Sequence, residues 1–168
     1  HRMWRFGVDP VVIPNGLGPE SFLEPDIEAV SQLRSAFRQR VLLAKVARWD
    51  PDKRWLLAVD IIGALKRRGL WPLLVARGGV EAHEAEVLMR ASQLGPSVVE
   101  RASTKCGAEG LAEALQDTQA ADIVVLRSHL DPAARGVLFQ GADAVLANSG
   151  HEPFGLVGLE TMAVSGLA

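Results

Sequence analysis

Two segments of the sequence carry side chains suited to binding an anionic, hydroxylated ligand. The first contains Arg48 and Lys53, five positions apart where a strand is expected to turn into a helix. A guanidinium offers a rigid fork to phosphate oxygens, an ammonium adds a mobile point charge, and a helix N-terminus adds partial positive charge. These residues are therefore candidates for binding a phosphate, although basic side chains near a helix start also occur without any ligand.

The second segment is NSGHEPFGLVGLETMA, in which seven residues separate Glu152 from Glu160. A helix is expected to begin between the two carboxylates, at Phe154, Gly155, Leu156 and Val157. Its free first-turn amides can receive diphosphate or sugar oxygens, and the glycine lets the backbone approach a ligand closely. Glu160 would lie about one and a half turns into the helix, where a carboxylate can accept hydrogen bonds from paired hydroxyls. The alternative is that Glu152 only complements the helix dipole and Glu160 is a solvated helix residue.

Short apolar runs alternate with longer amphipathic stretches, which is the pattern of βα units wound on a parallel sheet. The runs predict strands near 10–13, 41–47, 72–76, 122–127 and 143–147. Helices are predicted from the start signal Asp50-Pro51 to about Arg68, near 80–94 and 108–119, and from Asp131-Pro132 to Gly141. The stretch 95–110 is either a loop or a weak strand. We therefore expect an α/β fold: a doubly wound, mostly parallel, Rossmann-like sheet with helices on both faces.

Sheets of this kind bind their ligands outside the carboxyl ends of the strands. Both segments leave predicted strands at that edge. So does the loop RSHLDP, which contains Arg127 and His129. The loops at this edge are therefore where a ligand site is expected.

The composition is that of one soluble domain. The chain has 168 residues, 18 Lys and Arg against 20 Asp and Glu, a net charge of −2 and 48% hydrophobic residues. This balance argues against binding nucleic acid or anionic lipid by charge alone, and no apolar run approaches the ~18 residues of a membrane span.

The single cysteine, Cys106, suits a reducing compartment, so we expect a cytoplasmic protein. The chain begins without Met and stops after a helical pattern, so we expect a piece of a longer protein.

The block EPFGLVGLETMAVSGLA, with Arg48 and Lys53 in ARWDPDK and with VVIPNGL near the start, resembles the donor-binding half of retaining glycosyltransferases of group 1. These enzymes belong to glycosyltransferase family four and have the GT-B architecture. The resemblance implies that residues 1–168 form a nucleotide-sugar donor-binding domain, truncated at both ends relative to the full enzyme, with the acceptor domain N-terminal to it. It also implies a hexosyltransferase of carbohydrate biosynthesis that keeps the anomeric configuration, and an isolated chain that binds the donor but hardly catalyses.

The resemblance also implies roles for the charged residues of the two segments. Arg48 and Lys53 would bind the donor diphosphate. Glu160 would accept hydrogen bonds from the ribose hydroxyls, and Glu152 would lie beside the transferring sugar on its reacting face. Ala47 stands where the family usually has glycine, which places a methyl group close to the phosphate path.

The remaining contacts implied by the resemblance come from the backbone. Amides of residues 154–157 would hold sugar and phosphate oxygens, and the base would rest near Arg127 to His129. No cofactor or metal is expected, because the cations and amides would neutralise the leaving diphosphate. His83 and Glu84 match half of a zinc motif, but no second histidine follows at the required spacing.

Two other functions stay open from the residues alone. One is a sugar-nucleotide epimerase of the same architecture, and the other is a non-catalytic, doubly wound domain that binds a partner protein. His151 next to Glu152 is either a catalytic imidazole or a loop histidine that shapes the pocket. Asn15 of the PNG motif would belong to the turn that enters the domain.

Overall fold

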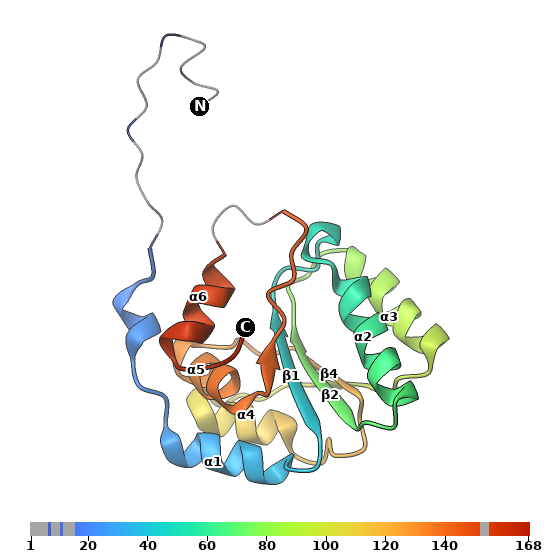
Figure 1. The fold of residues 1–168 in the computed structure, drawn as a ribbon. Helices are drawn as coiled ribbons and strands as arrows, with labels where there is room; N and C mark the ends of the chain where they lie inside the picture. The colour runs from blue at the N-terminus through green and yellow to red at the C-terminus, as the bar shows by residue number, and fades with distance from the viewer. Residues whose placement is uncertain (1–6, 8–10, 12–15, 152–154) are drawn as a thin grey trace.

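The computed structural model describes residues 7, 11, 16–151 and 155–168, and a five-stranded parallel sheet forms its centre. The strands are β1 (Val41–Val46), β2 (Pro72–Arg77), β3 (Val98–Arg101), β4 (Ile123–Leu126) and β5 (Ala144–Val145). Their order is β3-β4-β2-β1-β5, and every neighbouring pair is parallel (Figure 1). The inner strands are apolar runs because helices cover both of their faces.

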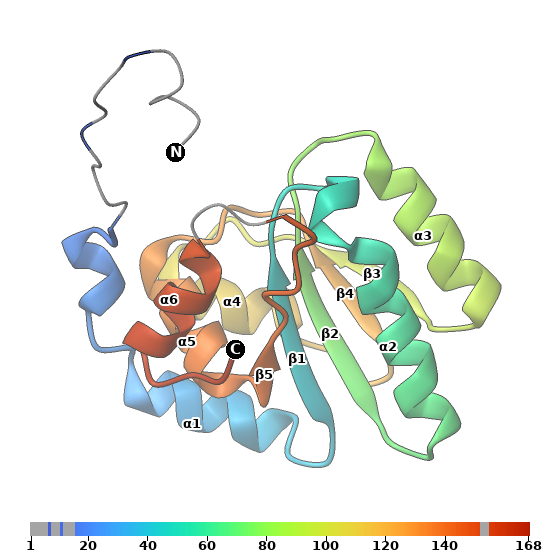
Figure 2. The same ribbon diagram turned by 45° about the horizontal axis from the view of Figure 1, so that its top comes forward.

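Helices lie on both sides of the sheet. They are α1 (Ile27–Ala36), α2 (Trp55–Arg67), α3 (His83–Leu94), α4 (Gly107–Leu115), α5 (Pro132–Gly141) and α6 (Leu156–Ala163), with 3-10 turns η2 (Pro19–Phe22) and η3 (Pro51–Lys53). One hydrophobic core holds α2 and α3 against the sheet, and the other holds α1, α4, α5 and α6 (Figures 1 and 2). The predicted doubly wound α/β fold is confirmed.

The strands predicted at 41–47, 72–76, 122–127 and 143–147 are present as β1, β2, β4 and β5. The undecided stretch 95–110 contains β3, an edge strand that pairs with β4. An edge strand needs less apolar surface than a central one, which explains its weak pattern. The strand predicted at 10–13 falls outside the described residues except for Val11, which is not in a strand and is 86% exposed.

Three helices differ from the sequence prediction. The helix predicted at 108–119 ends at Leu115, because Gln116 is extended and Asp117 adopts a left-handed conformation with φ 55°. Helix α1 was not predicted, although its cap is visible in the sequence. The Asp26 side chain accepts a hydrogen bond from the amide of Ala29 at 3.1 Å, as an N-cap residue does.

The helix predicted to begin at Asp50 and Pro51 begins instead at Trp55. Asp50 caps the separate turn η3 by accepting a hydrogen bond from the amide of Asp52 at 2.9 Å. Arg54 then takes a left-handed conformation (φ 51°, ψ 45°), which separates η3 from α2. Lys53 therefore lies in a short turn above the sheet and not in the first turn of a long helix.

Candidate functional site

The order of the strands reverses at β1. The chain passes from β1 through α2 to β2 on one side, whereas β5 lies on the other side of β1. Ligands of doubly wound sheets bind at such a point, outside the carboxyl ends of the strands. A cavity of about 190 Å³ lies there, lined by the end of β1, by the loop after β5, by Lys53 of η3 and by residues 155–158. We call it the switch-point cavity.

Two buried indoles anchor the loop that follows β1. Trp55 is fully buried and its Nε1 donates to the backbone oxygen of Arg48 at 2.7 Å. Trp49 is 2% exposed, and its backbone amide donates to Glu81 Oε2 at 2.9 Å. The two rings lie with centroids 4.0 Å apart. The loop that carries Arg48 and Lys53 is thus held by the hydrophobic core beneath it.

The loop that follows β5 is hydrogen-bonded to the loop that follows β1. The amide of Gly150 donates to the backbone oxygen of Asp52 at 2.7 Å, and the amide of His151 donates to Asp52 Oδ1 at 3.0 Å. The two loops run side by side at the top of the sheet in Figure 2. The structure thus brings together the two segments that the sequence singled out. His151 is exposed.

Helix α6 points its N-terminus at the switch-point cavity. Gly155 precedes the helix in a left-handed conformation with φ 64°, which glycine adopts without strain. Within the described residues, no side chain is hydrogen-bonded to this N-terminus. The first amides of a helix have no partner inside it, so those beside Leu156 and Val157 can donate to a bound anion. Gly155, Leu156 and Val157 line the cavity, as does Lys53.

A second lysine, which belongs to neither of the two sequence segments, also lines the cavity. Lys45 in β1 is 2% exposed, and its Nζ donates to the backbone oxygen of Leu146 at 3.2 Å and to Asn148 Oδ1 at 2.5 Å. Its Nζ also lies 5.1 Å from the ring centroid of Trp55. Burial, and secondarily the charge of Lys53, lower the pKa of Lys45 to about 8. A lysine inside the apolar run VLLAKVA was the available signal, because a buried ammonium needs partners.

The structure does not bring Arg48 or Glu160 into the lining of this cavity. Arg48 is exposed. Glu160 sits on α6, where its Oε1 lies 3.4 Å from Nη2 of Arg135 on α5. It lines a separate small cavity, of about 10 Å³, between α5, α6 and η2. A ligand that contacted both Lys53 and Glu160 would therefore extend from the switch-point cavity along the side of α6.

Arg127 and His129 lie in the loop after β4, also outside the switch-point cavity. The Arg127 guanidinium contacts Glu84 Oε1 at 2.6 Å and Glu100 Oε1 at 2.8 Å. Its hydrogen bonds hold the pKa of Glu100 below the usual value. The Arg127 side chain is therefore paired with carboxylates of β3 and α3. A ligand at this loop would be contacted by the backbone of the loop. The His129 side chain is exposed.

Three predicted residues lie outside the described part of the chain. They are Glu152, Phe154 and Asn15.

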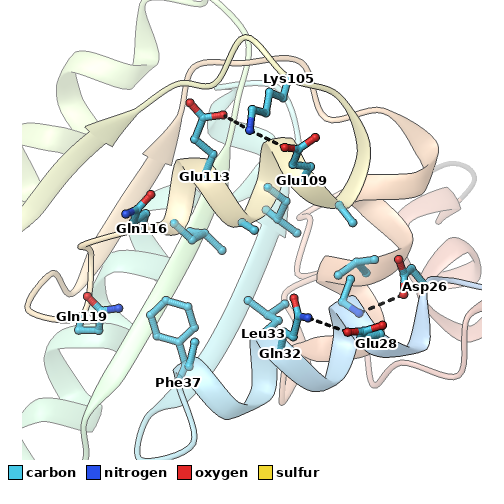
Figure 3. A pocket seen from close by; sticks show the side chains of 17 residues that line it. Asp26, Glu28, Gln32, Leu33, Phe37, Lys105, Glu109, Glu113, Gln116 and Gln119 are labelled. Carbon is cyan, nitrogen blue, oxygen red and sulfur yellow. Dashed lines mark hydrogen bonds and ion pairs between the residues drawn. The ribbon is translucent and has the colours of Figure 1, made fainter.

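A larger cavity, of about 740 Å³, lies elsewhere, in a groove between α1 and α4 (Figure 3). Its lining includes Leu33 and Phe37, and the charged side chains on its rim are four carboxylates (Asp26, Glu28, Glu109 and Glu113) and one ammonium, that of Lys105. The Lys105 ammonium on this rim is paired with Glu109 and Glu113 (Figure 3). A rim with excess negative charge disfavours an anion, so the smaller switch-point cavity is the better candidate for a phosphate group.

Neither a metal site nor a membrane span is found in the part of the chain that the structure describes. No group of three or more His, Cys, Asp or Glu side chains there is placed to hold a metal ion. No helix there combines the length and the apolar content needed to cross a bilayer.

Comparison with known proteins shows the fold. No protein-family model matches the sequence, and no curated protein does. A UDP-forming α,α-trehalose-phosphate synthase from Burkholderia xenovorans superposes with a TM-score of 0.55 and 15% identity, over 90% of this chain and 34% of that one. OtsA in its apo form gives 0.54 and 15% identity, over 86% and 30%. The N-terminal domain of Candida albicans trehalose-6-phosphate phosphatase gives 0.51 and 12% identity, over 82% and 28%.

The chain thus spans about a third of the length of the structures it matches. At these identities the likeness shows the fold alone, a doubly wound, Rossmann-like domain.

Proposed function

We propose that the chain is the donor-binding domain of a retaining glycosyltransferase that uses a nucleoside-diphosphate sugar. The observation that carries this proposal is the convergence of Lys53, Lys45 and the N-terminus of α6 on one cavity at the switch point of the sheet. This arrangement suits a diphosphate, because ammonium groups and helix amides all favour negative charge. The fold likeness to trehalose-phosphate synthases supports the same class of reaction.

The geometry suits the chemistry of glycosyl transfer. Breaking the anomeric C–O bond leaves negative charge on the nucleoside diphosphate and positive character on the sugar. Fixed cations and amide dipoles aimed at the leaving diphosphate favour this charge distribution over that of the ground state. Because the loops that carry them are hydrogen-bonded to each other, little reorganisation is needed when the charge develops.

Other parts of the proposal rest on the sequence motifs. Arg48 would hold the diphosphate at the mouth of the cavity, and Glu160 would exchange its contact with Arg135 for the ribose hydroxyls. Glu152 would lie beside the transferring sugar. The acceptor would bind to a domain N-terminal to this one, the protein would be cytoplasmic, and transfer would need no metal.

Calorimetry with UDP, GDP and ADP tests the proposal directly. We expect at least one of them to bind, and Lys53→Ala to weaken that binding about tenfold or more, since a charge-assisted hydrogen bond contributes ~1.5–3 kcal/mol. Lys105→Ala is the matched control, because that lysine lies on the distant groove between α1 and α4 and should not affect binding. Absence of binding, or equal affinities for the two variants, would contradict the proposal.

A further inference from the structure

We propose that Lys45 is a cation of the switch-point cavity that takes up a proton when an anion binds. This inference rests on the proposed function only in that the site receives an anionic ligand. It adds a residue and a pH dependence that neither the sequence motifs nor the fold imply.

The first argument is the position of Lys45. It comes from the inner strand β1, the residue is 2% exposed, and it lines the same cavity as Lys53. Its neighbours on the surrounding elements are mostly uncharged. Helix α2 presents Trp55, the loop after β5 presents Asn148 and the backbone of Leu146, and β2 places Ala76 beside it.

Within the described part of the chain, the charged group that acts on Lys45 is Lys53 of η3. A buried ammonium beside a second ammonium is disfavoured by desolvation and by like-charge repulsion. Both effects act in the same direction, and they lower the pKa of Lys45 to about 8. Without an anion, a substantial fraction of Lys45 is therefore neutral at slightly alkaline pH.

The second argument is the number of hydrogen-bond donors. The Nζ of Lys45 has two acceptors among the described residues, the oxygens of Leu146 and Asn148. A neutral amine has two N–H groups and can satisfy both, whereas an ammonium has three. The third N–H needs an acceptor. A phosphate oxygen in the cavity would supply it, and its charge would offset the repulsion between the two lysines.

Anion binding and protonation of Lys45 therefore favour each other. In linkage terms, an anion that raises the pKa of Lys45 binds more tightly below pH 8, and its affinity falls as the pH rises from 8 toward the pKa of the bound state. Each unit by which the anion raises the pKa corresponds to about a tenfold difference between the limiting affinities. The site would thus bind an anion most strongly at neutral and lower pH, and less strongly in alkaline solution.

The test is an NMR titration of the lysine side chains in the full chain, labelled with ¹³C at Cε, with and without sodium sulfate. Sulfate is the probe because its own charge is constant over this pH range. We expect one lysine to titrate near pH 8 in the free protein, and its midpoint to rise by about one unit with sulfate. Lys45→Met should remove this resonance. If that variant fails to fold, nuclear Overhauser contacts to the Trp55 indole identify it in the wild type.

Two further variants sharpen the outcome. Lys53→Ala should raise the free midpoint of Lys45, because it removes the like charge, whereas Lys105→Ala should leave it unchanged. A Lys45 midpoint that sulfate does not move, or that lies at the value of an ordinary exposed lysine, would overturn the inference.

The outcomes also separate this inference from the proposed function. If sulfate raises the midpoint but UDP, GDP and ADP do not bind, the proposed function fails and the inference stands. If a nucleotide binds and the midpoint does not move, only the inference fails.

Discussion

At the scale of single residues, the start and the middle of α6 face different surroundings. Gly155 and the first amides of the helix face a cavity with two lysines. Glu160, further along the same helix, faces Arg135. The proposed ribose-binding role of Glu160 therefore competes with a simpler role, that of an ion pair which joins α6 to α5.

Glu160→Gln distinguishes these roles when two ligands are compared. If Glu160 binds ribose, the variant should weaken UDP binding about tenfold, through the loss of ~1.5–3 kcal/mol from hydrogen bonds to a charged group, and should leave pyrophosphate binding unchanged. Calorimetry measures both affinities. Arg135→Ala is the control, because it removes the ion pair and keeps the carboxylate. Equal effects of Glu160→Gln on the two ligands, matched by Arg135→Ala, would assign Glu160 a structural role only.

At the scale of elements, one carboxylate connects two helices on the same face of the sheet. Asp131 caps α5 by accepting a hydrogen bond from the amide of Ala134 at 2.9 Å, and it also accepts one from the amide of Gly107, the first residue of α4, at 2.6 Å. These backbone hydrogen bonds, first that from Ala134 and then that from Gly107, hold the pKa of Asp131 below its usual value.

Asp131→Ala should lower the free energy of unfolding by about 1–3 kcal/mol, because it removes a cap and a second charged hydrogen bond. Urea denaturation at neutral pH measures this change. Glu24→Ala, which replaces an exposed carboxylate, should change stability by less than about 0.5 kcal/mol. Equal stabilities of the two variants would mean that the two helix starts do not depend on Asp131.

At the scale of the whole molecule, Asp122 joins segments that are distant in the sequence. It is 6% exposed and accepts hydrogen bonds from Nζ of Lys66 on α2 at 2.6 Å and from the amide of Ser97 at 2.7 Å. Burial by itself would raise the pKa of Asp122, but the hydrogen bonds from Lys66 and Ser97 outweigh it, and the pKa lies below its usual value. The carboxylate thus connects α2, the start of β3 and the start of β4.

This carboxylate should contribute to unfolding in acid. Because its pKa is lower in the folded than in the unfolded chain, its stabilisation is fully present above the unfolded value of about 4 and is lost as pH falls through the folded value. Asp122→Asn should lower the free energy of unfolding by about 2–4 kcal/mol at pH 7 and flatten the dependence below pH 4.

Thermal denaturation between pH 3 and pH 7 measures both effects. Asp60→Asn is the control, because its ion pair with Arg90 is about 40% exposed on both sides and should contribute less than about 1 kcal/mol. An Asp122→Asn variant as stable as the control variant would contradict this account.

The sequence by itself determined the elements whose signals are local. Buried strands show as apolar runs, and the start of α5 shows as the pair Asp131-Pro132, so β1, β2, β4, β5 and α5 could be predicted. The same patterns predicted the two loops at the carboxyl edge of the sheet, and they predicted that a ligand binds there. The sequence pattern of β3 was weaker than that of the other strands. This strand lies at the edge of the sheet and pairs with β4 on one side, so it needs fewer apolar residues than a central strand.

The tertiary structure decided which side chains meet. The order β3-β4-β2-β1-β5 places the end of β5 beside Lys45, sets Glu160 against Arg135, and commits Arg127 to Glu84 and Glu100. None of these pairs is encoded in local periodicity, because a period of 3.6 or 2 residues fixes which face is apolar but not which element covers it. A buried cation depends on its neighbours for both its partners and its pKa, so the role of Lys45 could be inferred only from the folded chain.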